Sequence, residues 1–164
     1  VHDDDGGTQT RTFVIHVAAT APSVTSAPDV SGIEGQSLTV TAGFTDPDPV
    51  DTFTASVVWG DGITTSAGVT FANGVGVVSA SHVYPDNTAW PVSLTITDRY
   101  GLSVTRALTA GVANAAPIAT PAAAQTTTAG SVLSVTAATF TDAGFTSVLA
   151  GTQETFTATI DWGD

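Results

Sequence analysis

Apolar and polar residues alternate along several short segments of this chain, which is the pattern of strands with one buried face. In residues 37–44 every second side chain is apolar, namely Leu38, Val40, Ala42 and Phe44. The same pattern and the turn residues between segments predict strands at 53–60, 63–71, 75–84, 90–98 and 102–112. No stretch has a convincing helical period. The pattern therefore predicts an all-β chain.

The chain also contains an internal repeat. Residues 1–22 match 96–117 at a constant offset of 95, and 34–46 match 129–142 with one inserted residue. The segment FTASVVWGD at 53–61 returns as FTATIDWGD at 156–164, at an offset of 103. A register held over this length is not expected by chance, and repeats of this kind decide the architecture.

The repeat divides the chain into three parts. Residues 1–21 correspond to the C-terminal strands of a preceding repeat, 22–116 to one complete repeat, and 117–164 to the N-terminal half of a following repeat. Some seven short strands in the complete part predict an antiparallel β-sandwich. We expect the chain to be a window on a longer tandem array. The alternative is that neighbouring chains complete the partial repeats by strand donation.

Several motifs in the complete repeat occur in a recognisable order: WGDG, then SHVYPDNTAWPVSLTITD, then NAAP at the junction. They resemble the PKD domain, an immunoglobulin-like β-sandwich. The family's pattern maps onto Trp59, Gly60, Asp61, Gly62, His82, Tyr84, Asp98 and Gly101. The third part departs from it, because DAGFTSVLAGTQE replaces DPDPVD there. The resemblance implies an immunoglobulin-like fold in an extracellular or cell-surface protein.

Composition narrows the functional classes. Fifteen acidic and three basic residues give a formal net charge of −12, which disfavours nucleic acid and anionic membranes as partners and attracts cations. The absence of Cys excludes disulfides and zinc–thiolate sites, and without Lys the chain cannot form Lys–Asn isopeptide cross-links. No apolar run reaches the roughly 18 residues of a membrane span.

Aspartates cluster in two places, which suggests calcium. One set is Asp46, Asp48 and Asp51 in a single loop, joined by Asp98, and the other is Asp3, Asp4 and Asp5 at the start of the chain. Ca²⁺ takes six to eight oxygen ligands from flexible loops, and the resemblance implies a calcium site near a domain junction. The alternative is that these aspartates only form turns by accepting backbone N–H groups.

Other candidate residues have simpler interpretations. Asp61 is expected to fix its turn, and Trp59 and Tyr84 are expected in the core. Trp90, beside a proline, is the one aromatic residue considered for exposed ligand contact. His2, His16 and His82 are not arranged for catalysis, so we predict no enzyme.

The sequence therefore predicts a non-catalytic stalk, spacer or fibre segment of a secreted or cell-surface bacterial protein, stiffened by Ca²⁺. Its expected partners are neighbouring repeats and other copies of itself. The alternatives are a carbohydrate- or protein-binding accessory module, or a filament subunit that assembles by strand donation between chains.

Overall fold

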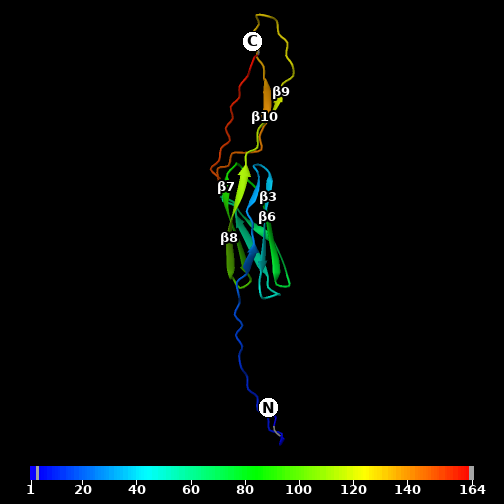
Figure 1. The fold of residues 1–164 in the computed structure, drawn as a ribbon, viewed down its shortest axis with the longest axis vertical. Helices are drawn as coiled ribbons and strands as arrows, with labels where there is room; N and C mark the ends of the chain where they lie inside the picture. Colours follow the sequence, from blue (N-terminus) through cyan, green and yellow to red (C-terminus); the bar gives the residue numbers. More distant parts are fainter. Residues whose placement is uncertain (3, 163–164) are drawn as a thin grey trace.

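The computed structural model describes residues 1–2 and 4–162, and the described residues contain strands and no helix. Eight strands lie within residues 22–116, the part predicted to be a complete repeat, and two short ones follow it (Figure 1). Their bounds are β1 Ser23–Ser26, β2 Val30–Ile33, β3 Ser37–Thr45, β4 Phe53–Val58, β5 Thr64–Ala72, β6 Val75–Val83, β7 Ala89–Asp98, β8 Ser103–Ala113, β9 Ile118–Pro121 and β10 Ala138–Thr141. The predicted all-β class is confirmed.

The eight strands form one curled sheet in the order β1-β3-β6-β5-β4-β7-β8-β2. Strand β5 makes the curl, because its first part pairs with β4 from Thr64 to Ala67 and its second part pairs with β6 from Gly68 to Ala72. The sheet thus folds over itself into two layers with the core between them.

One pairing departs from the predicted antiparallel arrangement. Strand β1 pairs antiparallel with β3, but β2 pairs parallel with β8 at the opposite edge of the sheet. The two strands follow each other with only residues 27–29 between them, and Pro28 lies in that link. The chain keeps its direction as it crosses from the layer of β1 to the layer of β8. Strand β2 therefore runs parallel to β8.

The core consists of the inward side chains that the alternation predicts. Val40, Ala42 and Phe44 of β3 share one core cluster with Val92, Leu94 and Ile96 of β7, and all six are at most 2% exposed. Burying each of the five larger side chains contributes on the order of 1.5–3 kcal/mol. This shared core fixes the register of both strands, since a shift by one residue would turn every apolar side chain outward.

The sandwich has two ends that matter for function. We call the loop 46–52 and the turn 98–102 the N-terminal pole, and residues 34–36, 59–63 and 85–88 the C-terminal pole. Figure 1 shows the segment before β1 leaving the sandwich at one end and the segment with β9 and β10 leaving at the other. Among the described residues, no helix is long and apolar enough to cross a membrane.

Candidate functional site

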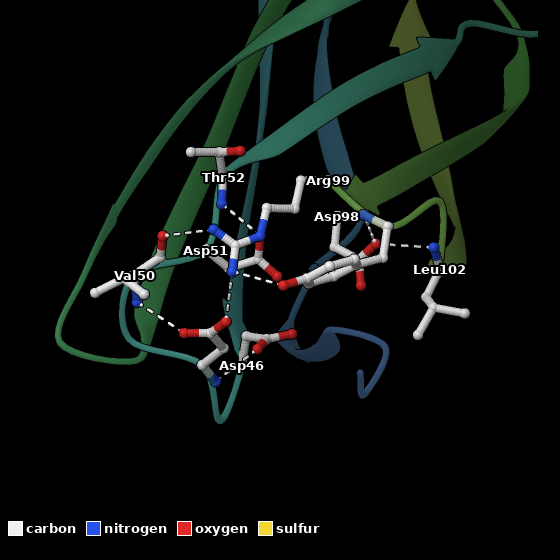
Figure 2. Close-up of polar contacts among 9 residues, drawn as sticks. Asp46, Val50, Asp51, Thr52, Asp98, Arg99 and Leu102 are labelled. Carbon is white, nitrogen blue, oxygen red and sulfur yellow. Dashed lines mark hydrogen bonds and ion pairs between the residues drawn. The ribbon is translucent and has the colours of Figure 1, made fainter. Parts of the chain in front are cut away.

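The N-terminal pole brings together the four aspartates predicted from the complete repeat. The pairing of Phe53 with Asp98 places the loop 46–52 beside the turn 98–102 (Figure 2). Asp46, Asp51 and Asp98 are buried, at 4%, 7% and 5% exposed. Aspartates so deeply buried need hydrogen-bond partners or a cation.

Each aspartate accepts hydrogen bonds from nearby backbone N–H groups. Asp46 Oδ1 accepts from Asp48 N at 2.8 Å, and Asp48 Oδ1 accepts from Val50 N at 3.1 Å. Asp98 Oδ1 accepts from both Tyr100 N and Leu102 N at 2.8 Å. These bonds are the turn chemistry that Asp residues supply locally.

Arg99 is a central residue of this pole that sequence reasoning missed. Its Nη2 lies 2.9 Å from Asp48 Oδ2, and its Nε lies 3.3 Å from Asp51 Oδ1 (Figure 2). Nη2 also donates to the Tyr100 hydroxyl at 2.8 Å. This hydrogen bond, with the Asp51 and Asp48 charges, raises the pKa of Arg99 further above its ordinary value. A side-chain cation thus already balances two of the four predicted calcium ligands.

Two carboxylate oxygens at this pole have no partner. Asp46 Oδ2 and Asp98 Oδ2 are both buried and accept no hydrogen bond. A hollow of about 660 Å³ lies beside the loop and is lined by linker residues 17–20, Asp46, Asp48, Asp51 and Tyr100. No three of these four aspartates have oxygens within 4.8 Å of one another, and Arg99 engages Asp48 and Asp51. Asp46 and Asp98 are therefore the two of the four that keep a buried, unpartnered oxygen for a hard cation.

Asp4 and Asp5, the described members of the acidic triplet near the start of the chain, lie away from this pole. Asp3 lies outside the described residues, and Asp4 and Asp5 are exposed in a turn closed by a bridge between His2 and Thr8. Figure 1 shows this end of the chain at the far end of an extended segment. Asp4 and Asp5 therefore do not form one site with the loop 46–52.

The expectation that Trp90 is exposed is wrong. Its side chain is 7% exposed, stacks on Tyr84 with ring centroids 5.5 Å apart, and donates from Nε1 to the Asp86 carbonyl at 3.2 Å. The adjacent proline suggested a loop, but Pro91 is an exposed residue within β7. Trp90 lies on the same face of β7 as the buried Val92, so it points into the core and not toward an exposed ligand surface.

The expected roles of Asp61, Trp59 and Tyr84 are confirmed. Asp61 Oδ1 accepts from Ile63 N at 3.0 Å, which closes the turn, and Oδ2 lies 2.6 Å from Nε2 of His82. Trp59 is fully buried, stacks on His82, and accepts a hydrogen bond at its carbonyl from the Tyr84 hydroxyl at 3.0 Å. Burial, then the Asp61 charge, raises the pKa of Tyr84. This network supports the fold.

A further acidic group was not predicted. Among the described residues, ligand atoms from three acidic or histidine side chains lie within 4.8 Å of one another only at Glu34, Asp86 and Glu154. These residues lie at the C-terminal pole and in the segment that follows the repeat. They come from distant points of the sequence and share no motif, so no local signal could have revealed them.

The comparison with protein families agrees with the motifs. The PKD domain family profile matches residues 19–112. Among solved structures, the chain is similar to the PKD domain of an M14-like peptidase from Thermoplasmatales archaeon SCGC AB-540-F20, with 26% identity and a TM-score of 0.44 over 56% of this chain and 92% of that one. No curated protein matches the chain significantly. With more than half of its length matched by the family profile, the chain belongs to the PKD domain family.

Proposed function

We propose that this chain is a non-catalytic structural segment of an extracellular or cell-surface protein, in which PKD-type repeats are joined end to end as a stalk or spacer. PKD domains are typically extracellular, non-catalytic modules. The observation that carries the proposal is the placement of the flanking segments at opposite poles of the sandwich (Figure 1). Repeats joined through opposite poles lengthen a protein in one direction, as in other repeat architectures.

Structural correspondences between the flanking segments and the complete repeat support this proposal. The bridge between His2 and Thr8 corresponds, at the offset of 95, to the pair Thr97 and Ser103 of β7 and β8. The glycines of these two turns, Gly6 and Gly101, have φ angles of 85° and 86°. This correspondence supports the assignment of the first segment to the end of a preceding repeat.

The third part shows a second correspondence. Ile118 of β9 pairs with Thr141 of β10, and these positions correspond to Ser23 and Thr45, which pair between β1 and β3. Asp142 Oδ1 accepts a hydrogen bond from Gly144 N at 2.9 Å, as Asp46 does from Asp48 N. These features favour a following repeat over an unrelated tail.

Calcium at the N-terminal pole is a subordinate part of the proposal. Asp46 and Asp98 would hold the ion through their orphaned oxygens, and the linker residues 17–20 line the hollow beside them. An ion there would stiffen the joint between the preceding segment and the sandwich.

The binding-module alternative has less support. Within residues 22–116, all of which the structure describes, Tyr100 is the one exposed aromatic side chain, and it lies against Arg99. Strand donation is favoured by a different observation, the exposure of apolar side chains before β1, namely Phe13, Val14, Ile15 and Val17. Such a strand could pair with another copy.

Sedimentation and small-angle X-ray scattering of the full chain test the proposal. We expect a monomer with a radius of gyration well above the roughly 15 Å of a compact protein of this length. A compact monomer would contradict the in-line arrangement. A concentration-dependent oligomer would favour strand donation.

A further inference from the structure

The C-terminal pole holds a carboxylate group that belongs to two parts of the chain. Glu34 lies in the turn between β2 and β3, Asp86 lies between β6 and β7, and Glu154 comes from the segment after β10. One oxygen from each lies within 4.8 Å of the others. Two oxygens on opposite sides of a Ca²⁺ ion, each about 2.4 Å from it, are about 4.8 Å apart. The spacing therefore suits this ion.

Glu34 gives an independent indication that something is bound here. Its side chain is 0% exposed, and its Oε1 accepts a hydrogen bond from Ala115 N at 2.8 Å. Its other oxygen, Oε2, is buried and has no hydrogen-bond partner. A fully buried carboxylate with an unpartnered oxygen lowers the stability of the fold unless that oxygen binds a cation or a proton.

Backbone contacts hold the third part of the chain against this pole. Phe145 N donates to the carbonyl of Pro85, next to Asp86, at 2.9 Å. Gly35, next to Glu34, has a φ of 69°, and a Cβ there would collide with the Ala143 carbonyl. These two contacts lie beside two of the carboxylates, so the approach of Glu154 is set by the docking of the segment.

The charge around Glu154 is unbalanced. Loss of hydration, followed by the charges of Asp86, Glu34 and Asp142, raises the pKa of this carboxyl, and each of these charges is negative. The chain has no Lys, and among the described residues none of its three Arg side chains forms a salt bridge with Glu34, Asp86 or Glu154; Arg99 pairs with Asp48 and Asp51 at the opposite pole. A divalent cation would relieve this repulsion.

We propose that Glu34, Asp86 and Glu154 form a Ca²⁺ site that joins the complete repeat to the segment that follows it. The proposal deepens the stalk function and rests on it for its biological meaning. The ligands are all oxygen atoms of carboxylates, which excludes soft-metal chemistry and favours a hard cation. Because the ligands come from both sides of the junction, the ion would hold that segment at a fixed angle.

Terbium luminescence on the full chain tests this site, because Tb³⁺ binds oxygen sites of the Ca²⁺ type. Trp90 donates to the Asp86 carbonyl, so its indole lies beside the site and can transfer excitation energy to the ion. We expect saturable Tb³⁺ emission that excess Ca²⁺ displaces. Glu154→Gln and Glu34→Gln should each weaken the affinity by about tenfold or more, since each removes a charged ligand.

Two matched variants separate this site from other acidic groups. Asp5→Asn makes the same change of charge at an exposed position, and Asp98→Asn removes a ligand of the N-terminal pole. Neither should change the Trp90-sensitised emission. Glu154 lies outside the sandwich, so Glu154→Gln should keep the near-ultraviolet circular dichroism of the folded core.

Three results would overturn the proposal: no Trp90-sensitised Tb³⁺ emission in the unaltered chain, sensitised emission that is unchanged in both Gln variants, or sensitised emission lost in Asp98→Asn but kept in Glu154→Gln. The stalk proposal is decided separately by scattering. An elongated particle that binds no ion at the junction would support the stalk proposal and refute the site. A compact particle that binds the ion would support the site and refute the stalk proposal.

Discussion

Residues 53–59 and 156–162 have nearly the same sequence and very different environments. Phe53, Ala55, Val57 and Trp59 point into the sandwich, and Val57 and Trp59 are fully buried. Their counterparts Phe156, Ile160 and Trp162 are 45%, 54% and 65% exposed, and residues 156–162 form no strand. The first copy is flanked by β5 and β7, whereas the 164 residues contain no second copies of these strands. Alternation favours a strand, but burial depends on partners far along the chain.

The largest expected effect concerns the two tryptophans. Trp59→Ala should lower the free energy of unfolding by about 3–5 kcal/mol, because it empties a fully buried aromatic site. Trp162→Ala should change it by no more than about 0.5 kcal/mol. Urea unfolding followed by circular dichroism measures both. Equal losses of unfolding free energy would show that residues 117–164 have a core of their own. The two copies of the segment would then not differ in burial.

The next effect concerns the partner of His82. Asp61→Ala removes the carboxylate from a buried pair that lies 2.6 Å apart, and it also removes the acceptor for Ile63 N. We expect a loss of about 1–3 kcal/mol from groups left without partners. Asp5→Ala, at an exposed position, serves as the control and should leave thermal unfolding unchanged. If Asp61→Ala unfolds with the same free energy as the unaltered chain, the turn at 59–63 does not contribute to the cooperative core.

A smaller effect should appear in alkaline solution. Because the pKa of Tyr84 is raised in the folded protein, its proton stabilises the fold below the ordinary tyrosine value near 10, and this contribution is lost as pH rises from there toward the folded value. The slope is at most about 1.4 kcal/mol per pH unit. Unfolding measured between pH 8 and 11 should show it. Tyr84→Phe should remove this component and cost about 1 kcal/mol at neutral pH; a slope unchanged by the substitution would refute the assignment.

The smallest effect on stability should come from Arg99. This side chain is 39% exposed, so Arg99→Gln should shift the melting temperature by a few degrees at most. The same variant releases Asp48 and Asp51, and we expect tighter Ca²⁺ binding at the N-terminal pole. Calorimetric titration of Glu154→Gln and of the double variant with Arg99→Gln isolates this pole. An unchanged Ca²⁺ affinity would mean that Asp48 and Asp51 only form turns and do not bind the ion.

Local chemistry could be predicted well from the sequence. The strands from β3 to β8 follow the alternation of apolar residues, and the Asp residues accept from the backbone N–H groups expected of turns. Both depend on residues a few positions apart. The short strands β1 and β2 have too few residues for a clear period, and the parallel pairing of β2 with β8 depends on the crossing between layers.

The contacts that define the poles could not be predicted in the same way. Arg99 meets Asp48 across 51 positions of sequence, and Glu34, Asp86 and Glu154 lie still farther apart. Only the folded sheet brings them together. Trp90 shows the converse, because its local sequence suggested exposure and the packing of Tyr84 against it decided otherwise.

The distance between the two flanking segments distinguishes an in-line stalk from a chain that folds back on the sandwich. The chain has no Cys, so Thr10→Cys and Gln125→Cys introduce a unique pair of spin-label sites at exposed positions. Ten-residue β7 alone spans about 33 Å. Pulsed electron paramagnetic resonance should therefore give a distance population well beyond about 33 Å, because the labels lie past opposite poles. A main population shorter than this would mean that the flanking segments fold back along the sandwich, and would contradict the in-line stalk.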